Sequence, residues 1–297
     1  MSLERIVLGT AGIGGIWGKV REDDSIQTVL EALAAGVPAI DTAPAYANAE
    51  LYVGKALRAW KGKMPVISAK AGRLQGFTPD NGKYDYSRTG MLRSISATLT
   101  RLGISELDVL FLHDPANIPE HDFGAAMEVM HELKRASLAR AVGLGGNPPL
   151  WAWNWIERGD VDALMEYNRL NACNCVAIHT SLKACLEQKV TYYAASPLHM
   201  GLLGRSYQTF TDNTPAWLGP ADMARARRLQ AIANGFGIPL RALAHRFLLN
   251  LQFSFKIVIG PSNPKELLET LGDFAAGPLP QAVFEQILQP GKDTIVP

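Results

Sequence analysis

Short apolar segments alternate with amphipathic segments along nearly the whole chain, and this alternation constrains the fold more than any other feature. Each apolar segment is a few residues long and is bounded by glycine or polar residues, as buried strands are. The segments between them carry apolar residues at the three- and four-residue spacing of a helix with one buried face. We expect strands at 6–8, 39–40, 66–69, 109–112, 139–143, 163–167, 190–194 and 256–259. We expect helices at 25–35, 49–60, 88–102, 125–135, 151–156, 181–188, 221–236, 240–250 and 264–271.

Strands that alternate with helices predict parallel strands joined by crossover connections. The chain has 297 residues, and no composition break or proline-, glycine- and serine-rich linker divides it. We therefore expect an α/β fold in which eight parallel strands close into a (β/α)8 TIM barrel, with residues 1–297 forming a single domain. A doubly wound open sheet is the alternative.

Composition excludes several classes of protein. The formal net charge is +1, so neither a nucleic-acid partner nor a membrane-surface partner is expected. No run of about 18 apolar residues occurs, so no spanning helix is expected, and the N-terminus has no signal-peptide core. The three cysteines, Cys173, Cys175 and Cys185, fit a reducing cytoplasm. No second Cys or His pair stands at zinc spacing from Cys173-Asn-Cys175, so we expect no metal site.

Titratable residues stand where three of the expected strands end. Asp41 follows the second strand, Lys70 the third and His113 the fourth, while Tyr46 lies in the loop after the second strand. Active sites of α/β barrels lie at the carboxyl ends of the strands, so these four side chains should gather at one face. Taken singly, each has an ordinary structural explanation, such as a turn, a packed ring or a solvated strand end.

Taken together, the four residue types suit acid–base chemistry. A phenol titrates near pH 10 and needs help to exchange protons near neutrality. We expect Lys70, with Asp41 as its partner, to lower the pKa of Tyr46 by its charge. The imidazole of His113 can hydrogen-bond to a substrate oxygen and fix its pose.

Three segments resemble the catalytic tetrad of the aldo-keto reductases: Asp41-Thr-Ala-Pro-Ala-Tyr46, Ser-Ala-Lys70 and Leu-His113-Asp-Pro. The similarity extends from about residue 8 to residue 271. It implies an eight-stranded barrel that moves a hydride between a nicotinamide cofactor and a carbonyl or an alcohol. It also implies that Tyr46 donates or accepts the proton, that Lys70 and Asp41 tune Tyr46, and that His113 orients the substrate.

Further segments resemble particular branches of that family. Lys70-Ala-Gly-Arg73, Tyr84-Asp-Tyr-Ser87 and His113-Asp-Pro115 look like the L-fucose and D-threo-aldose dehydrogenases. Ser196-Pro-Leu-His-Met-Gly-Leu-Leu203 and Pro215-Ala-Trp217 look like the L-galactose dehydrogenases. Pyridoxal 4-dehydrogenases look similar too, and all of these enzymes oxidise a cyclic hemiacetal to a lactone, usually with NAD.

The resemblance also implies cofactor contacts along the mouth of the barrel. It places Gly9, Thr10 and Ala11 near the nicotinamide, Asn147 at its carboxamide, Ser196, Leu198 and Gly201 near the pyrophosphate, and Gly260, Ser262, Glu266 and Thr270 near the adenosine. Trp17 and Trp217 could wall the substrate site, although ordinary loop packing explains them as well.

The choice between NAD and NADP depends on one region. NADP-preferring members often carry an arginine in or just before the last helix, and residues 262–266 contain none. Glu266 would repel a 2′-phosphate, although Lys265 stands beside it. We expect NAD, with NADP possible.

The resemblance therefore implies an NAD(P)-dependent oxidoreductase that oxidises an aldose, or another cyclic hemiacetal such as pyridoxal, to its lactone. An NADPH-dependent reductase of aldehydes or ketones is the alternative enzyme. A redox-sensing subunit similar to the potassium-channel β-subunits is the non-enzymatic alternative.

Overall fold

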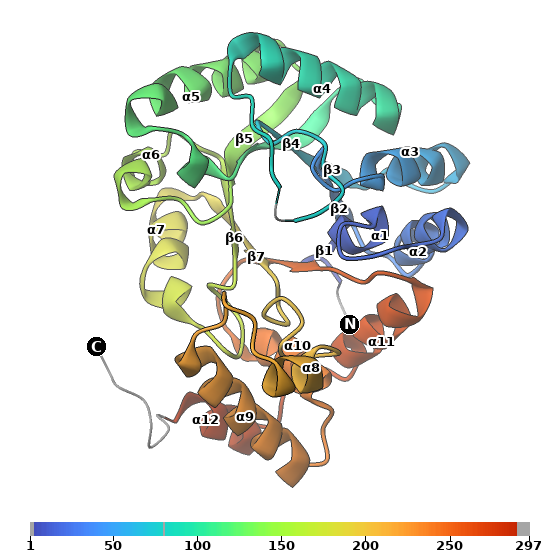
Figure 1. The fold of residues 1–297 in the computed structure, drawn as a ribbon, viewed down its shortest axis with the longest axis vertical. Coiled ribbons are helices and arrows are strands. Elements are labelled where there is room, and N and C mark those ends of the chain that lie inside the picture. The colour runs from blue at the N-terminus through green and yellow to red at the C-terminus, as the bar shows by residue number, and fades with distance from the viewer. Residues whose placement is uncertain (1–2, 80, 290–297) are drawn as a thin grey trace.

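The computed structural model, which describes residues 3–79 and 81–289, is a closed barrel of eight parallel strands in sequence order (Figure 1). Val7 pairs with Val258, which joins the first strand to the last and closes the sheet. The barrel prediction is confirmed, and the open-sheet alternative is wrong. The strands are β1 (Ile6–Gly9), β2 (Ala39–Asp41), β3 (Val66–Ala71), β4 (Leu107–His113), β5 (Ala139–Gly145), β6 (Ala163–Tyr167), β7 (Thr191–Ala195) and β8 (Lys256–Ile259).

Helices surround the barrel, and all nine expected helical segments are present (Figure 1). They are α2 (Glu22–Ala34), α3 (Ala49–Ala59), α4 (Arg88–Leu102), α5 (Glu120–Arg135), α6 (Trp153–Glu157), α7 (Ser181–Gln188), α9 (Pro220–Gly235), α10 (Leu240–Asn250) and α11 (Pro264–Ala275). The sequence did not predict α1 (Ala11–Gly14), α8 (Tyr207–Asp212) or α12 (Gln281–Leu288). The first two are too short to show a helical period.

The residues that flank two of the helices follow the usual preferences at helix ends only in part. Gly103 follows α4 with φ of 73°, the left-handed conformation that favours glycine at this position. Asn48 precedes α3, a position where asparagine often caps a helix, but its side chain makes no capping hydrogen bond. Within the described ranges, no helix is both long and apolar enough to cross a bilayer.

Alternation along the strands determines which side chains point into the barrel. One set of inward residues fills the interior, with Phe111 against Tyr193 at 5.4 Å between ring centroids. Successive residues of a strand face opposite sides, so residues two positions further along face inward again. Asp41 follows Ala39 in this way, and His113 follows Phe111. The carboxyl ends of β2 and β4 therefore direct polar groups into the barrel mouth.

Candidate active site

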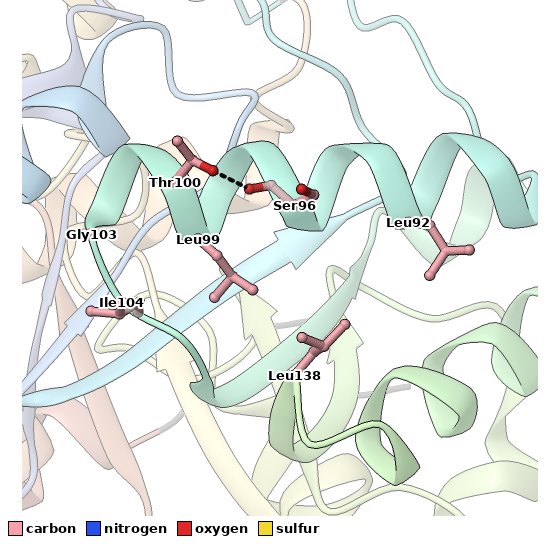
Figure 2. A pocket seen from close by; sticks show the side chains of 7 residues that line it. All are labelled: Leu92, Ser96, Leu99, Thr100, Gly103, Ile104 and Leu138. Carbon is pink, nitrogen blue, oxygen red and sulfur yellow. Dashed lines mark hydrogen bonds between the residues drawn. The ribbon is translucent and has the colours of Figure 1, made fainter.

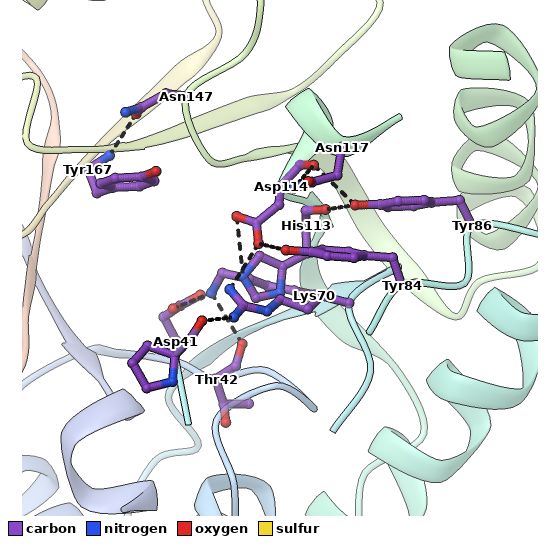
Figure 3. Close-up of polar contacts among 12 residues, drawn as sticks. Asp41, Thr42, Lys70, Tyr84, Tyr86, His113, Asp114, Asn117, Asn147 and Tyr167 are labelled. Atoms are coloured by element: carbon purple, nitrogen blue, oxygen red, sulfur yellow. Dashed lines mark hydrogen bonds and ion pairs between the residues drawn. The ribbon is translucent and has the colours of Figure 1, made fainter. Parts of the chain in front are cut away.

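A buried ion pair lies at the carboxyl end of β2 and β3. Lys70 Nζ lies 2.5 Å from Asp41 Oδ2, and both side chains are almost fully buried (Figure 3). Ser68 Oγ donates to the other carboxylate oxygen of Asp41 at 2.8 Å, and Lys70 also donates to the carbonyl of Thr42 at 3.3 Å. Both oxygens of the carboxylate thus have partners, which offsets the cost of burying the charges.

Tyr46 lies beside this pair. Lys70 Nζ is 4.8 Å from the centroid of the tyrosine ring. The ring meets the imidazole of His113 edge to face, with centroids 5.8 Å apart. The loop that carries Tyr46 packs against α1, where a Cβ on Gly14 would lie 2.1 Å from the carbonyl oxygen of Tyr46. The structure therefore brings all four predicted side chains together.

The pKa of Tyr46 differs from the sequence-based expectation. Burial raises this pKa above its ordinary value, and the nearby carboxylate of Asp41 raises it further. The charge of Lys70 lowers the pKa, as predicted, but its effect is smaller than that of burial. The expectation of a lowered pKa was therefore wrong in its net direction, and the phenol is protonated at neutral pH.

Lys70 is protonated and charged near neutral pH, whereas His113 is neutral. Burial acts to lower the pKa of Lys70, but Asp41 and Tyr46 together raise it above its ordinary value, so the ammonium stays charged. Burial, followed by the positive charges of Lys70 and Arg73, lowers the pKa of His113 well below its usual range. His113 is thus a neutral imidazole near pH 7, able to hydrogen-bond with a substrate oxygen.

The loop after β3 is fastened to the end of β4, a feature that the sequence did not reveal. Arg73 Nη1 lies 3.0 Å from Asp114 Oδ2. The hydroxyl of Tyr84 donates to the same oxygen at 3.3 Å (Figure 3). The hydroxyl of Tyr86 donates to the carbonyls of His113 and Asp114 at 2.8 and 3.0 Å. No local sequence pattern pairs Arg73 with a residue 41 positions away.

The residues predicted to contact the cofactor occupy the loops at this face and the helix after β8. Thr10 follows β1 and donates through Oγ1 to the carbonyl of Asp41 at 2.9 Å. Asn147 Oδ1 accepts from the backbone N–H of Tyr167 at 3.1 Å. Their neighbours in the prediction are Gly9 at the end of β1, Ala11 at the start of α1, Ser196, Leu198 and Gly201 after β7, Gly260 and Ser262 after β8, and Glu266 and Thr270 in α11. Their contacts with a cofactor stay predictions.

An arginine from another loop reaches the region in which the sequence showed none. Arg205 Nη1 lies 2.5 Å from Glu266 Oε1, across 61 residues of chain. Glu266 Oε2 accepts from the backbone N–H of Ser262 at 2.8 Å. The charge of Glu266 is thus partly neutralised by a cation that comes from the loop after β7. The absence of an arginine from residues 262–266 is therefore weaker support for NAD over NADP than the sequence suggested.

The two tryptophans considered for the substrate site are exposed. Trp17 is 48% exposed in the loop after α1, and Trp217 is 51% exposed between α8 and α9. The ring of Trp217 packs edge to face on Phe210 at 5.8 Å. Their role toward a substrate stays a prediction.

Cys173, His199 and Asp222 have possible metal-ligating atoms within 4.8 Å of one another, a grouping that sequence spacing did not reveal. Asn171 Oδ1 accepts from the backbone N–H groups of Cys173 and Asn174, so its Nδ2 faces His199 Nδ1 at 3.3 Å. The ring must accept this hydrogen bond at Nδ1, and its proton is on Nε2, 3.6 Å from Asp222 Oδ1. A metal-ligating histidine donates from its other nitrogen. The ring of His199 therefore lacks the donating second nitrogen that a metal-ligating histidine has.

One surface cavity lies at the amino ends of the strands, at the opposite end of the barrel from Asp41, Tyr46, Lys70 and His113. It has a volume of about 400 Å³ and lies between α4 and the approach to β5 (Figure 2). Gly103 and Ile104 precede β4, and Leu138 precedes β5, so the cavity belongs to the amino ends of the strands. That end of such barrels serves stability.

Comparisons with known proteins agree with the fold. The model of the aldo/keto reductase family matches residues 5–289. A D-threo-aldose 1-dehydrogenase from a Pseudomonas species is 25% identical over 97% of this chain and 94% of its own length. A pyridoxal 4-dehydrogenase from Microbacterium luteolum is 26% identical, covering 91% of this chain and 89% of its own. The structure of a glycerol dehydrogenase from Gluconobacter oxydans superimposes with a TM-score of 0.76 at 22% identity, over 99% of this chain and 95% of the other.

Proposed function

We propose, from a chain that belongs to the aldo/keto reductase family and is an NAD(P)-dependent oxidoreductase, a specific reaction. The enzyme oxidises an aldose, or another cyclic hemiacetal such as pyridoxal, to its lactone. The observation that carries the proposal is the buried pair of Asp41 and Lys70 beside Tyr46 and His113 at the carboxyl end of the barrel. The names of two relatives, an aldose dehydrogenase and a pyridoxal dehydrogenase, support a hemiacetal substrate.

The residues around the barrel mouth fit a nicotinamide dinucleotide. Arg205 offers a cation for phosphate oxygens, and a Cβ on Gly260 would meet nothing within 4 Å, so the backbone there leaves space. The amide nitrogen of Asn147 has no acceptor among the described residues and could bind a carboxamide oxygen. When bound, the nicotinamide ring accepts the hydride in oxidation and supplies it in reduction.

The side chains of the tetrad would handle the proton. In oxidation, the ionised phenol oxygen of Tyr46 would accept the proton of the substrate hydroxyl, while the carbon that bears this hydroxyl would lose its hydrogen as hydride. Lys70 stabilises the ionised phenol by its charge, and Asp41 holds Lys70 in place. Neutral His113 hydrogen-bonds to the same substrate oxygen and fixes its position.

We propose NAD as the preferred cofactor. Glu266 repels a 2′-phosphate but can accept hydrogen bonds from a ribose diol. Its pairing with Arg205 makes the discrimination smaller than an isolated carboxylate would give.

One observation favours the alternative, an NADPH-dependent reductase of aldehydes or ketones. The raised pKa of Tyr46 keeps the phenol protonated, and this form donates a proton to a carbonyl. The same residues serve both directions, so the substrate decides between the two activities.

A substrate panel tests the proposal. Purified protein is assayed with a set of aldoses and with pyridoxal, each with NAD and with NADP, by following the absorbance of the reduced cofactor. Simple aldehydes and ketones are assayed in parallel with NADH and NADPH. We expect oxidation of at least one aldose or of pyridoxal, with a lactone as the product. Reduction of simple carbonyls without any hemiacetal oxidation would favour the alternative, and no turnover in either direction would contradict both.

A further inference from the structure

We propose that Asp114 binds substrate by accepting a hydrogen bond from the hydroxyl on the carbon next to the reacting carbon. The preferred substrates are then hemiacetals that carry a hydroxyl on that neighbouring carbon, as aldoses do at C2. This assignment rests on the proposed function and deepens it, because it names a feature that the substrate must have.

The backbone fixes Asp114 directly beyond the end of β4. Its N–H donates to the carbonyl of Gly145 at 2.7 Å, which continues the pairing of β4 with β5. Asp114 has φ of 51° and ψ of 60°, a left-handed conformation that is uncommon for a residue with a side chain. Such conformations persist where the surrounding structure holds them, and they cluster at functional sites. The side chain of Asp114 is therefore set beside that of His113 by the strand itself.

The two carboxylate oxygens of Asp114 have different surroundings. Oδ2 accepts from Arg73 and Tyr84, which hold the carboxylate in one orientation. Oδ1 accepts from no donor among the described residues, and it lies 4.0 Å from His113 Nε2. That separation is too long for a direct hydrogen bond. One acceptor of a partly buried carboxylate is thus available next to the imidazole.

This spacing suits two hydroxyls on adjacent carbons. One substrate oxygen can lie within about 3 Å of the imidazole while the hydroxyl on the next carbon lies at a similar distance from Oδ1. A hydrogen bond to an ionised acceptor is stronger than a neutral one, and Arg73 keeps the acceptor oriented at no further cost to binding. A substrate without the second hydroxyl leaves Oδ1 without its partner and is disfavoured.

Asp114 could instead serve only to anchor the loop after β3, through Arg73 and Tyr84. The two roles predict different results. An anchor affects all substrates alike, whereas a hydroxyl acceptor affects only substrates that carry the second hydroxyl. The test therefore compares pairs of substrates rather than absolute rates.

The experiment uses the aldose that the substrate panel identifies and its 2-deoxy analogue; D-arabinose and 2-deoxy-D-ribose form one such pair, because they differ only at C2. The ratio of their kcat/KM values is measured for wild type and for Asp114→Asn. An amide oxygen can still accept from Arg73 and Tyr84, so the variant keeps the loop contacts. We expect wild type to favour the parent sugar by about 10- to 100-fold, the range for one charge-assisted hydrogen bond. We expect Asp114→Asn to reduce that ratio to less than about 5-fold, chiefly by slowing the parent sugar.

Asp122→Asn is the matched control. It removes the same charge from an exposed position on α5, where the carboxylate forms an ion pair only with His121 among the described residues. The ratio of kcat/KM for the parent sugar to that for its 2-deoxy analogue should be the same in this variant as in wild type. A reduced ratio in this control would show that net charge, and not the position of Asp114, sets the preference.

Further results would also overturn the assignment. Equal kcat/KM for a sugar and its 2-deoxy analogue in wild type does so without any variant, and it leaves the proposed function standing. An equal loss on both sugars in Asp114→Asn shows a loop anchor. Oxidation of pyridoxal but of no aldose overturns this assignment and leaves the proposed function standing, because pyridoxal has no hydroxyl on the carbon next to the reacting carbon. Oxidation of neither an aldose nor pyridoxal removes the proposed function and this assignment together.

Discussion

Asp41 and Lys70 depend on each other at the residue scale. Each is almost fully buried, and each is the main charge partner of the other. Removing one partner leaves an uncompensated buried charge, which is among the most costly changes that a core can undergo. The pair therefore contributes to stability as well as to the environment of Tyr46.

Substitutions of the pair should separate these two contributions. Lys70→Met leaves the carboxylate of Asp41 with Ser68 as its remaining side-chain donor, so we expect a loss of about 3–5 kcal/mol in the free energy of unfolding. Activity should also collapse, because the charge that favours ionised Tyr46 is gone. Asp41→Asn should be milder in kcat, since Lys70 stays positive. Urea unfolding and steady-state kinetics on both variants measure this. If a folded Asp41→Asn variant is as inactive as Lys70→Met, Asp41 has a role beyond holding Lys70.

The raised pKa of Tyr46 predicts the pH dependence of the reaction. Oxidation needs the ionised phenol, which is scarce at neutral pH and increases about tenfold per pH unit below the pKa. We expect kcat/KM for oxidation to rise between about pH 7 and about pH 9, the window below the raised pKa. Reduction uses the protonated form and should stay nearly constant in the same buffers. An oxidation profile that is flat from about pH 7 would show that another group accepts the proton.

At the scale of elements, two loops bring together residues that are far apart in sequence. The loop after β7 carries Arg205 to α11, and the loop after β3 carries Arg73 to the end of β4. Neither the contact of Arg205 with Glu266 nor that of Arg73 with Asp114 can be predicted from the spacing of apolar residues in strands or helices. Both lie at the face where the four tetrad side chains meet, so these loops are where specificity for cofactor and substrate is most open to change.

Cofactor preference should respond to the pair of Arg205 and Glu266. Glu266→Gln removes the charge that repels a 2′-phosphate and releases Arg205 to bind it. We expect the ratio of kcat/KM for NADP to that for NAD to rise by about 10- to 100-fold, as one charge-assisted contact is gained. Adding Arg205→Ala to this variant should remove most of the gain.

Lys265→Gln is the control for the placement of α11. Lys265 is exposed and next to Glu266 in sequence, so a register shifted by one residue would make it the phosphate contact. We expect its cofactor ratio to match wild type. A larger change in Lys265→Gln than in Glu266→Gln would show that Lys265, and not Glu266, faces the ribose.

Sequence patterns were sufficient for the strands and for part of the site, for a physical reason. Asp41, Lys70 and His113 directly follow apolar runs, and a parallel barrel places all such positions at one face. The bonds of Asp114 with Arg73 and Tyr84 depend on loop conformation, which no period encodes. The direction in which the pKa of Tyr46 shifts could not be predicted, because the cost of burying the charged phenol depends on all the groups packed around the ring.

At the scale of the whole molecule, buried neutral histidines link stability to pH. His113 is buried with its pKa well below the usual range, so it stays neutral in the folded state, whereas in the unfolded chain it binds a proton below about pH 6.5. The unfolded state then holds more protons than the folded state, and stability falls as the pH falls. His245, buried beside Asp273, has its pKa lowered by burial and acts in the same direction.

Acid titration of stability should show the contribution of His113. We expect the free energy of unfolding to decline below about pH 6.5 by up to about 1.4 kcal/mol per pH unit for this one group. His113→Asn should reduce the slope by that amount, whatever its effect on absolute stability. Chemical denaturation at several pH values measures the slope. An unchanged slope in His113→Asn would mean that His113 takes up a proton as readily when folded as when unfolded.

The central claim is that this barrel oxidises its substrate through Tyr46, and Tyr46→Phe tests it most directly. The substitution keeps the ring that packs against His113 and removes only the hydroxyl. We predict that kcat falls by about 10²–10⁴-fold, the usual contribution of a general acid–base residue, while the Kd of the cofactor changes by less than about twofold. A folded Tyr46→Phe enzyme that turns over at close to the wild-type rate would contradict the account.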